Sequence, residues 1–69
     1  MTNTNKLKGL IASKGFSQRS FAKLINMNKD TFNNKLNNKS EFKTGEILKI
    51  CEALQIVEKS DKVDIFLSE

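Results

Sequence analysis

The chain has no histidine, tryptophan, tyrosine or proline, and only one cysteine among its 69 residues. Without histidine there is no imidazole for general-base catalysis or for a zinc site, and one cysteine can form neither an internal disulfide nor a metal-binding cluster. The composition therefore argues against an enzyme and against a metalloprotein, and it implies no cofactor and no small-molecule substrate. A single thiol is also typical of a reducing, cytoplasmic compartment.

Long apolar runs are missing as well. No stretch reaches the length of a signal-peptide core or of a membrane span, so we expect a cytoplasmic protein without a membrane partner. A chain of 69 residues has room for one small core of about a dozen side chains. We therefore expect residues 1–69 to form a single domain in which nearly every large apolar residue lies in that core.

Charge is present in abundance and is unevenly placed. Residues 1–43 contain nine basic and two acidic side chains, a net charge of +7, whereas residues 44–69 contain three basic and six acidic side chains, a net charge of −3. A polyanion such as double-stranded DNA would be attracted to the first part and held off the second. A bias toward lysine and asparagine that merely solvates the surface is the alternative, but it does not explain the asymmetry.

The stretch from Ser17 to Asn38 contains two short helical patterns separated by a tight turn, which predicts a helix-turn-helix. Ser17 is a good N-cap, and Phe21 and Ile25 follow at helical spacing. Asn26 stands where the turn needs a positive φ, which glycine adopts most readily and asparagine next. The first of the two helices should therefore end at Asn26.

The second helix of the motif is expected over Lys29–Asn37. Asn28 supplies its N-cap, and Phe32 and Leu36 form an apolar pair one turn apart, so this helix should bury one narrow stripe. A free face rich in lysine and asparagine is chemically suited to the major groove of DNA. The residues expected to face outward are Lys29, Asp30, Asn33, Asn34, Lys35 and Asn37.

Two further helices are predicted on either side of the motif. Residues 1–5 are polar and expected to be frayed, and Thr4 or Asn5 could cap a helix that runs to about Lys14 and stops at Gly15. Phe16, placed before the Ser17 cap, is expected to pack like a hydrophobic staple. After a loop, Thr44 should cap a fourth helix over Gly45 to about Gln55, with Cys51 buried on its apolar stripe.

The tail over residues 56–69 allows two interpretations. Ser60 or Asp61 could start a short fifth helix through Leu67, but the sequence VDIFL also alternates like a strand. We favour the helix. The apolar residues Val63 to Leu67 should cap the core, contact a second subunit, or both.

From about Leu7 to Leu54, the chain resembles the lambda-repressor/Cro-like helix-turn-helix domains of phages and bacteria. It is most similar in kind to the small Cro-like and repressor-antagonist (modulator of repression) proteins of temperate phages of Gram-positive bacteria. The resemblance implies an all-α fold, a compact four- to five-helix bundle. It rests on Gly15-Phe16-Ser17-Gln18, Phe21-Ala22, Ile25-Asn26-Met27-Asn28, Thr31-Phe32 and Leu36-Asn37-Asn38-Lys39.

The resemblance also implies which side chains meet DNA, because in this family the helix after the turn enters the major groove. The base-contacting residues would be Lys29, Asp30, Asn33 and Asn34. The phosphate-contacting residues would be Gln18, Arg19, Asn28, Asn37 and Lys39. Two residues depart from the family pattern: Asn26 replaces the usual glycine, and Asp30 puts a carboxylate where phosphates would repel it.

Two functions follow. The first is a phage-type transcriptional regulator that binds operator DNA as a weak homodimer in a lysis–lysogeny switch. The second is an antirepressor or corepressor that uses the same fold to bind a phage repressor's DNA-binding domain. Asp30 and the surplus apolar residues Leu24 and Phe66 favour this second function and would form its partner surface.

Overall fold

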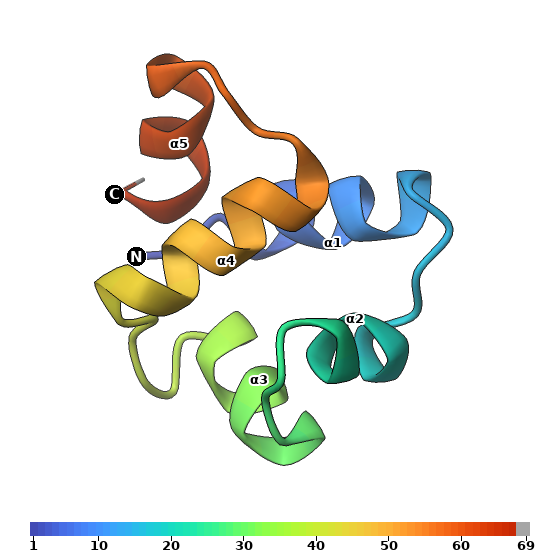
Figure 1. The fold of residues 1–69 in the computed structure, drawn as a ribbon. Helices are drawn as coiled ribbons and strands as arrows, with labels where there is room; N and C mark the ends of the chain where they lie inside the picture. Colours follow the sequence, from blue (N-terminus) through green and yellow to red (C-terminus); the bar gives the residue numbers. More distant parts are fainter. Residues whose placement is uncertain (68–69) are drawn as a thin grey trace.

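The computed structural model describes residues 1–67, which form five α-helices and no strand within that range. The helices are α1 (Thr4–Ser13), α2 (Gln18–Leu24), α3 (Lys29–Leu36), α4 (Thr44–Leu54) and α5 (Lys59–Phe66). In Figure 1, α2 and α3 form one corner of the molecule, α4 crosses in front of α1, and α5 closes the opposite end. The predicted all-α class is confirmed. Positions 68 and 69 of the expected tail lie outside the described residues.

The N-terminal residues make contacts that the sequence did not indicate. Asn3, not Thr4 or Asn5, caps α1, because its side chain accepts a hydrogen bond of 3.1 Å from the Lys6 backbone N–H. The Thr4 hydroxyl instead donates to the Leu36 carbonyl at 2.6 Å. This contact with the end of α3 gives the first residues a partner that local sequence could not indicate. At the other end of α1, Gly15 adopts a φ of +84° and stops the helix as expected.

All five phenylalanine rings form a continuous row through the core. Successive ring centroids lie 5.6, 5.8, 5.9 and 6.0 Å apart, within the range in which edge-to-face and tilted pairs are favourable. The row runs in the order Phe16, Phe21, Phe32, Phe42 and Phe66. It begins in the loop before α2 and ends in α5, so one aromatic contact after another joins the helix-turn-helix to the far end of the molecule.

A capping box and a staple fix the start of α2. The Ser17 hydroxyl accepts from the Ser20 N–H at 3.0 Å, and the Ser20 hydroxyl accepts in return from the Ser17 N–H at 2.9 Å. Phe16 precedes the cap and packs against Phe21 in the first full turn, which is the arrangement of a hydrophobic staple. The two predicted roles at the start of this helix are confirmed.

In the second half of the chain, the helix starts differ from the expected ones. Thr44 is the first residue of α4, and Lys43 takes the N-cap position, with its backbone N–H donating to the Glu46 carboxylate at 2.8 Å. Cys51 is buried, and burial raises the pKa of its thiol although nearby Lys62 lowers it. The tail folds as a helix that begins at Lys59, and the strand alternative is not observed.

Candidate nucleic-acid interface

The turn between α2 and α3 is held by two backbone hydrogen bonds. Asn26 has a φ of +58°, and its N–H donates to the Lys23 carbonyl at 3.1 Å, while the Met27 N–H donates to the Ala22 carbonyl at 2.9 Å. Together they form a Schellman motif, in which a left-handed residue satisfies the last carbonyls of a helix. Asparagine can take this conformation in place of glycine. The predicted end of the first helix is therefore confirmed, and the turn is a defined structure.

Asn28 starts α3 as predicted. Its side-chain oxygen accepts from the backbone N–H groups of Asp30 and Thr31 at 2.8 and 3.3 Å. On the inner side of the helix, Phe32 and Leu36 are fully buried. The cap fixes where α3 begins, and the two apolar side chains fix which of its faces points away from the core.

One residue of α3 does not lie where the sequence placed it. Lys35 was expected to face outward, but it is only 8% exposed, and its Nζ lies 2.7 and 2.8 Å from the two carboxylate oxygens of Glu46. The first turn of α4 packs over this part of α3 and brings the carboxylate to the lysine. Lys35 is therefore part of the inner face, and the exposed face of α3 is correspondingly narrower.

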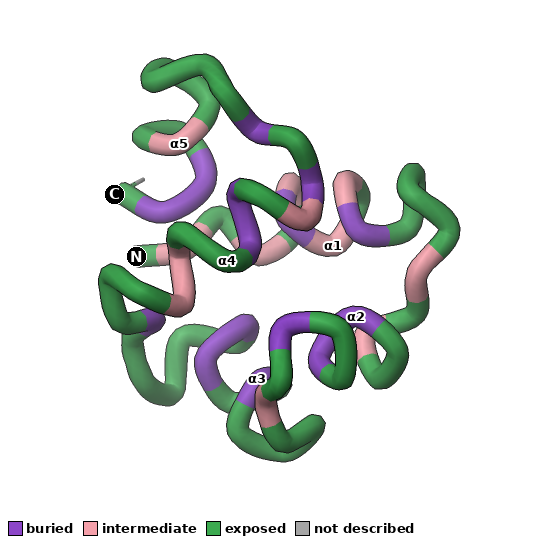
Figure 2. The backbone as a smooth tube through the Cα atoms, viewed as in Figure 1, coloured by how far each residue is buried: buried purple, intermediate pink, exposed green. Residues whose placement is uncertain are grey.

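The four candidate base-contacting residues remain together on that exposed face. All are classed as exposed, and Figure 2 shows the outer side of α3 turned away from the buried segments of the other helices. They are Lys29, Asp30, Asn33 and Asn34. The carboxylate of Asp30 lies in the first turn of α3, where it complements the partial positive charge of the helix N-terminus. Asp30 thus has a local structural role that is independent of any base.

The candidate phosphate-contacting residues fall into two groups around α3. Gln18, half-buried, and Arg19, exposed, lie in the first turn of α2, close in sequence to the capping box. Lys39 is exposed beyond the other end of α3, and its backbone N–H donates to the Asn34 carbonyl at 2.8 Å. Cationic side chains therefore flank the amide-rich face at both ends. Contact with the two sugar-phosphate backbones that border a DNA groove would require this arrangement.

Asn28 and Asn37, the other two phosphate candidates, are both engaged with α3 itself. The oxygen of Asn28 is the helix cap, which leaves its NH2 group to point outward. The NH2 group of Asn37 donates to both the carbonyl and the side-chain oxygen of Asn33. Among the described residues, the side-chain nitrogen of Asn28 has no partner, whereas that of Asn37 is already engaged.

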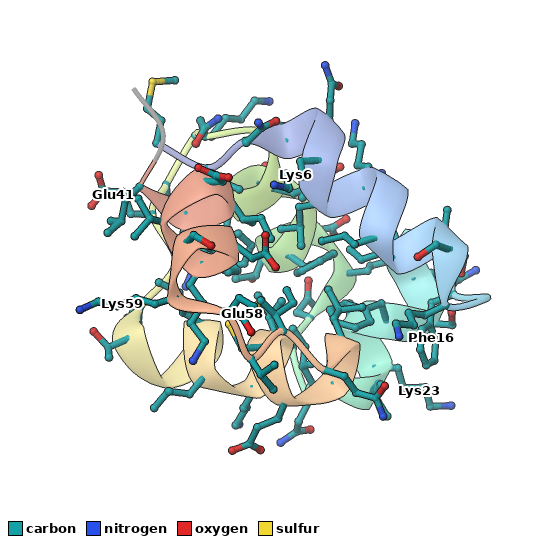
Figure 3. All side chains as sticks on the ribbon, turned by 90° about the horizontal axis from the view of Figure 1, so that it is seen from above. Lys6, Phe16, Lys23, Glu41, Glu58 and Lys59 are labelled. Carbon is teal, nitrogen blue, oxygen red and sulfur yellow. The ribbon has the colours of Figure 1, made fainter. Side chains whose placement is uncertain are left out.

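A shallow hollow beside the turn brings together three cationic side chains, of which the sequence had singled out only two as DNA contacts. Lys23, one helical turn after Arg19, is the addition, and Figure 3 shows it on the periphery of the molecule, on the same side as Phe16. Its spacing from Arg19 was the signal in the sequence, because residues four apart share a helix face. The lining residues are Arg19, Lys23, Asn26, Met27, Asn28 and Lys29.

The expected protein-partner surface is only partly present. Leu24 is 54% exposed and borders an open hollow between the end of α2 and the outer side of α4, and Asp30 is exposed as well. Phe66, by contrast, is 7% exposed and packs edge-on against Phe42. It belongs to the core and not to an exposed surface, because α5 folds back as a helix over the apolar end of the bundle.

These elements define a helix-turn-helix protein in which the second helix of the motif projects a polar face between clusters of positive charge. The chain matches the family model of the Cro/C1-type HTH DNA-binding domain over residues 6–57, which is most of its length, and it belongs to that family. No curated protein and no solved structure shows significant similarity to it. The resemblance to the lambda-repressor/Cro-like family is thus confirmed at the level of the family.

Residues 1–67 show neither a candidate metal site nor a candidate membrane span. No group of three or more potential metal-ligating side chains occurs there. No helix among those described is long and apolar enough to cross a membrane.

Proposed function

We propose that this protein is a sequence-specific transcriptional regulator of a temperate phage, which binds operator DNA in the host cytoplasm as part of a lysis–lysogeny switch. The observation that carries the proposal is the exposed face of α3, which presents Lys29, Asn33 and Asn34 from a helix of the Cro/C1 family. Lysine and asparagine are side chains that pair with purine edges in the major groove. The net charge of +7 over residues 1–43 supports attraction to the duplex.

Operator binding of this kind is expected to involve two copies of the chain. A dimer would place two α3 helices in successive major grooves about 34 Å apart on a palindromic site. If each subunit neutralises roughly four phosphates, the affinity should fall with salt with a log–log slope on the order of −7. The flanking cations Arg19, Lys23 and Lys39 are the side chains that would supply most of these contacts.

The test is a comparison of two DNA duplexes at moderate salt. One duplex carries the intergenic region beside the gene for this chain, and the other carries the same bases in scrambled order. The proposal expects at least a ten-fold preference for the first duplex, which corresponds to about 1.4 kcal/mol. Equal affinity for both duplexes, at every salt concentration tested, would contradict it.

One observation favours a second candidate function, that of an antirepressor or corepressor. Leu24 is about half exposed and lines a hollow together with Lys49, Glu52 and Ala53 of α4, and Asp30 is exposed as well. An apolar residue of this kind next to charged neighbours suits a protein partner, here the DNA-binding domain of a phage repressor. Titration with the repressor encoded beside this gene would show a complex by calorimetry, and Leu24→Ser should weaken it. The absence of any complex would remove this candidate.

A further inference from the structure

Asn37 uses its side chain on another residue of the exposed face of α3. Its Nδ2 lies 3.0 Å from the Asn33 carbonyl oxygen and 3.1 Å from the Asn33 side-chain oxygen, one helical turn earlier. The backbone N–H of Asn37 also donates to the same carbonyl at 3.0 Å. The side-chain nitrogen of Asn37 therefore contacts two acceptors, and both belong to Asn33.

This pairing leaves Asn37 poorly suited to hold a phosphate. Its side-chain nitrogen is already engaged with Asn33, and the side-chain atom that has no partner among the described residues is the carbonyl oxygen, which is an acceptor. Phosphate oxygens are acceptors too, so the two would repel one another. A hydrogen bond from the Asn37 nitrogen to a phosphate would compete with its hydrogen bonds to Asn33.

The same pairing restricts how Asn33 can meet a base. An asparagine recognises adenine with both ends of its amide, its oxygen accepting from N6 and its nitrogen donating to N7. In Asn33 the oxygen is held toward Asn37 along the helix, so the nitrogen becomes the end that is turned outward. That nitrogen has no hydrogen-bond partner among the described residues. Guanine and thymine present only acceptors in the major groove, which a leading NH2 group fits.

We propose that Asn37 is a positioning residue that orients the amide of Asn33, so that α3 reads a guanine or a thymine at that position and disfavours adenine. The inference rests on the proposed function as far as the bases are concerned. The orientation itself is a property of the free protein, and it can be tested without DNA.

The first experiment measures side-chain mobility by ¹⁵N relaxation of the asparagine NH2 groups in the free protein. The Asn33 amide should be restrained in the wild type and mobile in Asn37→Ala. The Asn34 amide, on the same helix with no side-chain hydrogen bond among the described residues, is the matched control and should be mobile in both. Equal mobility of the Asn33 amide in both proteins would overturn the proposal, whatever the protein does with DNA.

The second experiment measures affinity for operator duplexes in which each base pair is replaced in turn. Asn37→Ala should shift the preference at one base pair toward adenine by about five-fold or more. In an Asn33→Ala background the same change should shift no preference. If Asn37→Ala fails to fold, Asn37→Leu keeps a side chain of similar size with neither NH2 donors nor charge, and it gives the same readout.

The alternative roles of Asn37 give different results. A uniform loss of affinity for all sequences, in both backgrounds, would mean that Asn37 holds a phosphate, and it would overturn the proposal. A shift of preference that persists without Asn33 would mean that Asn37 reads a base itself, which also overturns it. A wild-type protein with no sequence preference would contradict the proposed function, while the relaxation experiment would still decide the orientation of Asn33.

Discussion

Lys35 and Glu46 form a bidentate ion pair that ties α3 to the first turn of α4, with Nζ–oxygen distances of 2.7 and 2.8 Å. Only 10% of the lysine side chain and 23% of the glutamate side chain are exposed. One oxygen of the carboxylate also accepts from the Lys43 backbone N–H. Because this pair is largely removed from water, its loss should destabilise the fold more than the loss of a surface pair.

Removing one member of this pair should destabilise the fold, whereas removing both should cost much less. Loss of one partner of a fully buried pair costs about 3–5 kcal/mol, and partial solvation of Glu46 should bring the cost of Lys35→Met to about 2 kcal/mol. The double variant Lys35→Met/Glu46→Leu should lie closer to the wild type. Urea denaturation measures both free energies.

A surface pair provides the control for this experiment. Lys6 and Asp64 lie 3.4 Å apart with side chains 38% and 61% exposed, and Lys6→Met should change stability by no more than about 0.5 kcal/mol. Equal effects of Lys6→Met and Lys35→Met would show that burial of the Lys35–Glu46 pair contributes nothing to stability.

Stability should also depend on the protonation of Glu46. Burial by itself raises the pKa of this carboxyl, but hydrogen bonds from the Lys35 side chain and the Lys43 N–H, together with their charges, bring the pKa below the usual 4.5. A carboxyl whose pKa is lower in the folded than in the unfolded state stabilises the fold, and this contribution is complete when the pH is above the unfolded-state pKa. It disappears as the pH falls through the folded-state pKa. Glu46→Gln should therefore lose less stability than the wild type between pH 5 and about pH 3. Parallel stability curves over this range would contradict the assignment.

The effect of a substitution at Asn26 on stability should depend on whether the new residue tolerates a positive φ. Asn26→Gly should keep the stability of the protein within about 1 kcal/mol, because glycine adopts the left-handed conformation freely. Asn26→Val should cost about 1–2 kcal/mol or more, because its branched side chain clashes in that conformation. Thermal unfolding of the two variants tests this, and a valine variant as stable as the glycine variant would argue against a left-handed turn.

Substitutions on the exposed face of α3 and substitutions of the cations around it should change DNA binding in different ways. Asn34→Ala should relax the preference at one base pair with little change in salt dependence, since a base contact carries sequence information. Lys39→Ala should weaken binding to all sequences alike and lower the magnitude of the salt slope by about 1.

Lys59 is the matched control for this comparison. Figure 3 shows Lys59 on the side of the molecule opposite Lys23, and it belongs to the acidic second part of the chain. Lys59→Ala should leave both the affinity and the salt slope nearly unchanged. A loss of affinity equal to that of Lys39→Ala would point to attraction by net charge alone.

The parts of the fold that could be predicted from the sequence are those determined by near neighbours. Ser17, Asn26 and Asn28 were assigned correctly because a cap or a left-handed turn depends on residues within about four positions. The helix-turn-helix and the all-α class followed from these signals and from apolar spacing, and the family match agrees with them.

The residues that were misplaced depend on contacts distant in sequence. Lys35 is polar and next to the apolar stripe, so nothing local shows that Glu46 lies over it when α4 packs against α3. Asn3 caps α1 because Thr4 is already bonded to the end of α3. Phe66 is buried because α5 closes the bundle over Phe42. In each case the deciding partner comes from another segment of the chain.

Through the row of five phenylalanine rings, the stiffness of the corner formed by α2 and α3 should depend on residues at the other end of the molecule. Phe66 supports Phe42, which supports Phe32 on the inner side of α3, so each ring limits the movement of the next. A chain shortened before α5 would lose the last support in this series. The C-terminal helix, though it touches no candidate contact residue, is thus part of what keeps the projecting helix in place.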